Sequence, residues 1–149
     1  MSRPRRERLP PETFHLPVDE LRSGVYSDKY FVRARHVLRQ DRHSPIVLMQ
    51  VFCKSRAVLC GVDEAIAILK LASDGWHALT VYALHDGDAT DPLDTVMTIE
   101  GPYDAFAHLE TLYLGVLARR TRVATQTRRV VAAASPKDVF FFPARHDHY

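Results

Sequence analysis

The sequence has no apolar run long enough to cross a membrane, and its opposite charges nearly cancel. A membrane-spanning helix needs about 20 apolar residues, whereas the longest apolar stretch here, Ile46 to Cys53, is far shorter and contains Gln50. The 20 basic and 18 acidic residues leave a net charge of +2. That excess is too small to give the strong positive field typical of nucleic-acid-binding proteins. We therefore expect neither a membrane protein nor a nucleic-acid-binding protein.

Cysteine is scarce, and the basic start of the chain lacks the features of a targeting signal. The two cysteines, Cys53 and Cys60, lie in apolar surroundings and match no zinc or redox spacing. The arginines among the first eight residues are followed by Pro10-Pro11-Glu12 rather than by an apolar segment, so a secretory signal is not expected. We predict a reduced, cytoplasmic setting, with residues 1–13 as a basic flexible arm.

The patterns that are present predict a mixed α+β domain. Apolar residues recur at three- and four-residue steps in some segments, which is typical of helices, and lie in short β-branched runs in others, which is typical of strands. The helices are expected at 17–22, 28–40 and 63–72, with two more over 102–134. The strands are expected at 46–53, 57–60, 78–84, 95–99 and 138–142.

Several of these predictions specify which residues are buried. Ser27 is predicted to be the N-cap of the 28–40 helix. The buried stripe of that helix is predicted to consist of Tyr30, Phe31, Ala34, Val37 and Leu38. In the last helix the inward residues are expected to be Val123, Thr127, Val130, Val131 and Ala134, and the strand at 138–142 is expected to be buried.

Residue spacing alone reveals no self-contained catalytic or metal-binding motif. The acidic cluster Asp86, Asp88, Asp91 and Asp94 fits no calcium-loop spacing and is better explained by turn geometry. His146 and His148 are two ligands at most, too few for a closed zinc site. The arginines between 119 and 129 lack the interleaved aromatic residues of a nucleic-acid-stacking surface, and Glu110 is expected on a solvated helix face.

Three stretches taken together, in this order and spacing, resemble nicotinate phosphoribosyltransferase, a type II phosphoribosyltransferase. The first is Gly24 to Phe31, which contains the motif Asp-Lys-Tyr-Phe. The other two are discontinuous segments that together reach almost to the end of the chain: Asp86–Asp88 with Glu100–Tyr103 and Leu109–Leu112, and Ala124-Thr125 with Phe142–Asp147.

The resemblance implies an N-terminal α/β sandwich domain joined to a larger α/β barrel. Residues 14–101 would form the sandwich domain, and residues 102–149 would supply the connecting helices and the first strand of a truncated barrel. Members of this family are more than twice as long as this sequence. The resemblance therefore implies a fragment, a truncated product or a partial sequence that is inactive alone.

The resemblance also implies roles for three residues. Tyr30 matches the family tyrosine that reaches the pyridine site of the neighbouring subunit of a homodimer, where an aromatic face can stack on nicotinate. Arg145 matches an arginine at the carboxyl end of the first barrel strand, where barrel active sites lie. His146 occupies the position of a second basic residue of the family. These three are the expected substrate-binding residues, and none is expected to bind a metal.

The expected substrates are nicotinate and phosphoribosyl pyrophosphate, with Mg²⁺ and ATP as cofactors, in the salvage route to NAD. Quinolinate phosphoribosyltransferases carry an arginine immediately before the Thr-Leu of the long helix, whereas this sequence has Glu110 before Thr111-Leu112. A carboxylate there would repel the second carboxyl of quinolinate. A quinolinate phosphoribosyltransferase-like fragment and a non-catalytic interaction or binding module remain the alternatives.

Overall fold

The structure, a computed structural model, describes residues 6–142. Within that range, antiparallel strands form a sheet in the order β1–β5–β3, where β1 is Ile46–Phe52, β5 is Thr95–Pro102 and β3 is Thr80–Ala83. A smaller sheet pairs β2 (Ala57–Val58) with β4 (Ala89–Thr90). The central strand β5 is long because the chain stays extended through Gly101-Pro102, beyond the predicted end of this strand.

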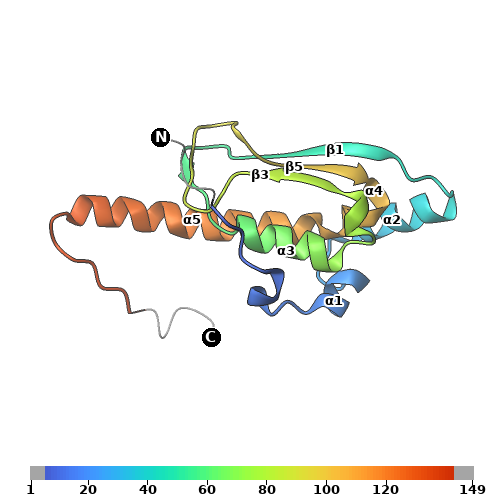
Figure 1. The fold of residues 1–149 in the computed structure, drawn as a ribbon, viewed down its shortest axis with the longest axis horizontal. Coiled ribbons are helices and arrows are strands. Elements are labelled where there is room, and N and C mark those ends of the chain that lie inside the picture. The colour runs from blue at the N-terminus through green and yellow to red at the C-terminus, as the bar shows by residue number, and fades with distance from the viewer. Residues whose placement is uncertain (1–5, 143–149) are drawn as a thin grey trace.

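Helices lie under one face of the larger sheet (Figure 1). The α-helices are α1 (Val18–Ser23), α2 (Lys29–Gln40), α3 (Val62–Ala72), α4 (Tyr103–Phe106) and α5 (Glu110–Ala134). Short 3-10 helices are η1 (Pro11–Phe14), η2 (Trp76–Ala78) and η3 (Ala107–Leu109). In Figure 1, α5 runs beneath the sheet and extends beyond it. This mixed arrangement confirms the α+β fold class.

The core fills the space between the sheet and helices α3 and α5. Residues of α3 spaced three and four apart face inward, among them Ala65, Ile68 and Leu69, while Met97 and Ile99 alternate along β5 toward the same core. Each fully buried large apolar side chain stabilises the fold by about 1.5–3 kcal/mol. Because α5 contributes Tyr113 to this core, the beginning of that helix is fixed against the domain.

The predicted cap and stripe of α2 are only partly correct. The helix is capped by Asp28 rather than Ser27, because the Ser27 hydroxyl donates instead to the carbonyl of His108. Phe31 is buried, but Tyr30 and Val37 are exposed. The reason is that α2 packs mainly on η3 and α4, which cover only one narrow side of it.

The sequence predicts two helices over 102–134, and the structure divides this range differently. After the short α4 and η3, one uninterrupted helix, α5, runs from Glu110 to Ala134. No proline interrupts this stretch, and Ser135-Pro136 ends the helix as predicted. The sequence predicts that Val123, Val130 and Val131 face inward, but all three are exposed. The side of α5 that faces the β2 region is instead that of Thr121 and Thr125, whose hydroxyls accept from the Cys60 and Val58 N–H groups.

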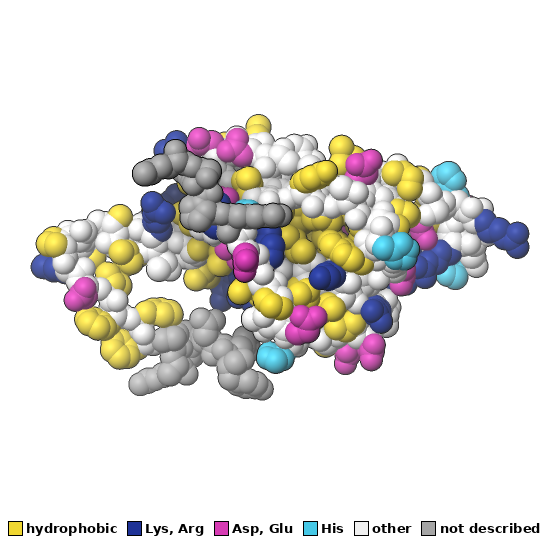
Figure 2. Space-filling model, viewed as in Figure 1, with side chains coloured by type: hydrophobic (Ala, Val, Ile, Leu, Met, Phe, Trp, Pro, Cys, Tyr) yellow, Lys and Arg dark blue, Asp and Glu magenta, His cyan; other side chains and the backbone are white. Residues whose placement is uncertain are grey.

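The predicted buried strand at 138–142 does not form in this structure. Residues 138–142 have no regular structure, and Phe140, Phe141 and Phe142 are 78%, 77% and 85% exposed. A strand needs a neighbour that accepts and donates its backbone hydrogen bonds, and no described strand pairs with this segment. Figure 2 shows hydrophobic side chains along the tail that follows α5.

The described part of the basic arm contacts the domain rather than extending freely. Arg6 pairs with Asp88 at 2.6 Å, and Arg8 pairs with Asp63 at 2.9 Å while also donating to the carbonyls of Ala83 and Leu84. Over the described range, no helix has the length and apolar character required to cross a membrane.

Candidate functional site

The first turns of α2 and α5, far apart in sequence, are joined by a pair of hydrogen bonds. The Asp28 backbone N–H donates to the Thr111 hydroxyl at 3.1 Å, and that hydroxyl donates to the Asp28 carboxylate at 3.0 Å. The neighbouring residue Ser27 is tied to the His108 carbonyl. These contacts bring Tyr30 on α2 to the same part of the molecule as Glu110 on α5.

Tyr30 presents an aromatic ring to solvent. It is 61% exposed, and its ring contacts that of Phe31 with the centroids 4.1 Å apart and the planes tilted by 42°. Slight desolvation, followed by the negative charges of Asp28 and Glu110, raises the pKa of Tyr30. The phenol therefore stays neutral near pH 7, and its exposed face can stack on a flat ring.

Glu110 is half-buried, whereas the sequence predicts a solvated position for it. Burial raises the pKa of its carboxyl group. Its negative charge in turn contributes, after burial, to raising the pKa of Tyr103 and Tyr113. The Asp28–Thr111 hydrogen bonds place Tyr30 and Glu110 in the same region, and the surface they form combines an exposed ring with a partly desolvated carboxyl group.

The other residues singled out in the sequence do not join this surface. Arg145 and His146 lie outside the described residues, as does His148. Two members of the acidic cluster serve turn geometry, as predicted: the Asp88 carboxylate accepts from the His85 N–H, and the Asp94 carboxylate accepts from the Asp91 N–H. Asp86 instead accepts from the N–H of Val62, at the start of α3. Between residues 6 and 142 there is no group of three or more His, Cys, Asp or Glu residues that could hold a metal ion.

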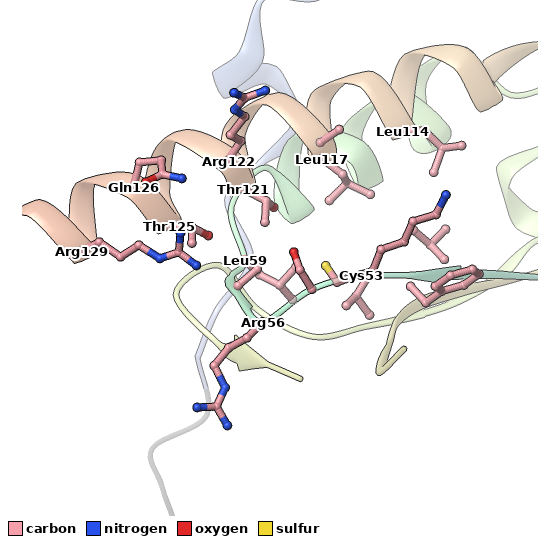
Figure 3. A pocket seen from close by; sticks show the side chains of 17 residues that line it. Cys53, Arg56, Leu59, Leu114, Leu117, Thr121, Arg122, Thr125, Gln126 and Arg129 are labelled. Carbon is pink, nitrogen blue, oxygen red and sulfur yellow. The ribbon is translucent and has the colours of Figure 1, made fainter. Parts of the chain in front are cut away.

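A cavity of about 430 Å³ lies between α5 and the segment that joins β1 to β2 (Figure 3). Its lining contains basic but no acidic residues. The basic side chains do not converge, because Figure 3 shows Arg56 and Arg122 pointing away from the space between the helix and the strand. Arg56 is paired with Asp91 at 2.7 Å. This cavity therefore shows no assembled anion site.

Sequence reasoning missed the Asp28–Thr111 contact and the partial burial of Glu110. Both Asp28 and Thr111 lie in the stretches that carry the family resemblance, which was the available signal. Nothing in their spacing along the chain indicates that they meet, because 83 positions separate them.

Comparisons with known proteins agree on the fold. The sequence model described as "Quinolinate phosphoribosyl transferase, N-terminal domain" matches residues 28–121. The solved structure of nicotinate-nucleotide pyrophosphorylase from Pyrococcus furiosus is 33% identical with a TM-score of 0.76, covering 89% of this chain and 34% of that one. Comparison with curated proteins gives no significant match.

Two more distant structures share the fold at lower identity. NadC from Streptococcus pyogenes is 20% identical with a TM-score of 0.66, covering 87% of this chain and 45% of that one. Human nicotinic acid phosphoribosyltransferase is also 20% identical, with a TM-score of 0.63, covering 75% of this chain and 29% of that one.

The chain therefore spans less than half the length of the solved structures that it matches. The matched range, 28–121, is more than half of the 149 residues and contains Asp28, Tyr30, Glu110 and Thr111. The chain belongs to the quinolinate phosphoribosyltransferase N-terminal domain family of type II phosphoribosyltransferases.

Proposed function

We propose that this chain is the N-terminal part of a phosphoribosyltransferase that joins a pyridine carboxylate to phosphoribosyl pyrophosphate in pyridine nucleotide biosynthesis. The observation that carries the proposal is the family match over residues 28–121. The surface formed by Tyr30 and Glu110 lies within this range and offers an exposed aromatic face, which suits a flat pyridine ring.

Quinolinate is the substrate that the comparisons favour. The matching family model is that of a quinolinate phosphoribosyl transferase domain. Its name refers to a pyridine dicarboxylate, and a site for two carboxylates would need compensating positive charge. The arginine that quinolinate enzymes carry before the Thr-Leu of the long helix is Glu110 in this chain, so that charge would have to come from elsewhere.

Nicotinate is the second candidate, and Glu110 is the observation that favours it. Two like charges 4 Å apart repel by about 4 kcal/mol at an effective dielectric constant of 20. A carboxylate at the pyridine site therefore disfavours the second carboxyl of quinolinate more than it disfavours a monocarboxylate. The structure of human nicotinic acid phosphoribosyltransferase shares the fold, which is compatible with this candidate.

In the proposed reaction the pyridine nitrogen attacks the anomeric carbon of phosphoribosyl pyrophosphate, and pyrophosphate leaves. In a homodimer, the Tyr30 ring would stack on the pyridine substrate bound in the neighbouring subunit. The ring is available for this contact because the described residues leave most of it exposed. Arg145 and His146 would bind carboxylate or phosphate groups. Mg²⁺ and ATP are part of the proposal, and no step is assigned to them.

The test uses protein purified from the complete reading frame that encodes this chain. Formation of pyridine nucleotide from phosphoribosyl pyrophosphate is measured with quinolinate and with nicotinate as separate substrates. Turnover of quinolinate supports the first candidate, and selective turnover of nicotinate supports the second. Turnover of neither acid would overturn the proposal.

Two variants link the activity to the proposed site. Tyr30→Ala should raise KM for the pyridine acid by about tenfold, because a ring-stacking contact contributes about 0.5–1.5 kcal/mol beyond the area that it buries. Tyr26→Ala is the matched control, since Tyr26 is also an exposed tyrosine near the start of α2. Glu110→Arg should shift the preference toward quinolinate. An unchanged ratio between the two acids would contradict the role given to Glu110.

The remaining alternative is a non-catalytic interaction module. The turnover assay tests it, because such a module would convert neither pyridine acid. The domain boundaries at 13 and 101, the cytoplasmic location and the absence of nucleic-acid binding stay predictions. A salt-dependent affinity of the purified protein for RNA would contradict the last of these.

A further inference from the structure

We infer that Asp28 and Thr111 are positioning residues that hold the Tyr30 ring and the Glu110 carboxyl group on one surface. The inference rests on the proposed function, because it assigns a purpose to the surface that would meet the pyridine ring. It adds two residues to which the family resemblance gave no role.

The geometry of the contact is reciprocal. A hydroxyl group can donate one hydrogen bond and accept two. The Thr111 hydroxyl uses both abilities on one residue, since it accepts from the Asp28 N–H and donates to the Asp28 carboxylate, at 3.1 and 3.0 Å. Two bonds between the same two residues restrict their relative rotation, which one bond would leave free.

The contact replaces the interaction that a residue at the Asp28 position ordinarily makes. Asp28 is the N-cap of α2, where a carboxylate usually accepts from a backbone N–H of the first turn. Here no such side-chain capping bond is present, and the carboxylate accepts from Thr111 instead. Asp28 therefore connects two helices and makes no side-chain capping bond to its own.

The position of the contact explains what it controls. Tyr30 follows Asp28 by two residues, and Glu110 immediately precedes Thr111. On the inner side, Ser27 is tied to the His108 carbonyl, and both Phe31 and His108 are buried. The Asp28–Thr111 pair therefore lies between these buried residues and the two side chains of the proposed surface, Tyr30 and Glu110. A change in the pair should alter the distance between the Tyr30 ring and Glu110.

Both hydrogen bonds of the pair are solvent-exposed, so breaking them leaves no buried polar group without a partner. The chain should therefore still fold without the pair, which separates positioning from folding. Thr125 supplies a matched comparison on the same helix, because its hydroxyl accepts from the Val58 N–H at 2.9 Å and lies far from Tyr30 in sequence.

The experiment follows the ring resonances of Tyr30 and Tyr103 by NMR in the purified 149-residue chain while the carboxyl groups are titrated. In the unmodified chain both rings should shift with the ionisation of Glu110, whose charge acts on both phenols. The Glu110→Gln variant should abolish this part of the response and so assign it to Glu110.

Thr111→Val removes the donor and acceptor at nearly constant size. It should reduce the Glu110-dependent shift of Tyr30 by at least about half, because a charge effect falls as distance grows, while the shift of Tyr103 is kept. Thr111→Ser, which keeps the hydroxyl, should restore the Tyr30 response. Thr125→Val breaks a partly buried hydrogen bond, so it should lower stability at least as much and leave both responses unchanged.

An unchanged Tyr30 response in Thr111→Val would overturn the inference, and so would loss of the response in Thr125→Val. Because the readout involves no turnover, its failure is distinct from failure of the proposed function. Lack of activity toward both pyridine acids would remove the proposed purpose of the surface while leaving the measured coupling intact.

Discussion

The burial of His108 predicts that the domain loses stability as the pH falls below neutrality. His108 lies in η3 with its side chain 0% exposed. Burial is the main cause that lowers the pKa of this imidazole from 6.5 to about 4, and the positive charge of Arg35 lowers it further against the opposing effect of Asp74. The neutral imidazole is therefore the form that the folded state favours.

The sign and size of the effect follow from linkage between protonation and folding. The unfolded chain binds a proton at His108 near pH 6.5, whereas the folded chain resists doing so until about pH 4. The stabilisation from the neutral ring is thus fully present well above pH 6.5 and is lost progressively between pH 6.5 and 4. A shift of one unit corresponds to about 1.4 kcal/mol, so the loss between pH 7 and pH 5 is about 2 kcal/mol.

Urea unfolding at pH 7, 6 and 5 measures this loss. Trp76, the one tryptophan of the sequence, packs against the core and reports unfolding by its fluorescence. His108→Leu removes the titrating group and should flatten the pH dependence whatever its stability at pH 7, whereas His43→Leu, at an exposed histidine, should keep the slope. A slope in His108→Leu equal to that of the unmodified chain would refute the reasoning.

Three further predictions concern other parts of the chain. In urea unfolding, Gly61→Ala should destabilise the domain by about 1–2 kcal/mol more than Gly87→Ala. Both glycines have a positive φ, but a Cβ at Gly61 would lie 2.8 Å from Arg120 Cδ, whereas a Cβ at Gly87 would meet nothing within 4 Å. Equal losses of stability would contradict this explanation. Replacing Phe140, Phe141 and Phe142 with serine should reduce self-association in light scattering, since these rings are exposed; a monomeric unmodified chain would contradict that prediction. The purified 149-residue chain should form no pyridine nucleotide with phosphoribosyl pyrophosphate, Mg²⁺ and ATP, because it spans only about a third to under half of the matched structures; detectable product would show that it is sufficient.

The sequence predicts best those elements that have a characteristic local composition or whose apolar face is covered by the rest of the domain. The periodicity of α3 predicts most of its buried face: Ala65, Ile68 and Leu69 are buried as expected, whereas Ile66 and Leu71 are only partly buried. The sequence also predicts β1 within one residue, since short β-branched runs between turn residues are typical of strands. The short β4, by contrast, has only two residues, too few to show alternation.

The candidate site was predictable only in part, for a different physical reason. Tyr30 is singled out by the family motif, but its apolar spacing predicts a buried residue and the structure leaves it exposed. Glu110 is expected in solvent because single carboxylates usually lie there, whereas the structure leaves it half-buried. The surroundings of a side chain depend on segments distant in sequence, and no local pattern records them.

The far half of α5 shows most clearly what a hydrophobic pattern does and does not specify. Val123, Val130 and Val131 recur at helical spacing, yet all three are exposed. Spacing of this kind indicates that a helix has an apolar face, and such faces are normally covered. It does not indicate which segment covers that face. The inward orientation predicted for these valines requires a covering segment, and residues 6–142 do not supply one. The same reasoning applies to Phe140–Phe142, whose composition suits a strand while the described residues offer no neighbouring strand to pair with.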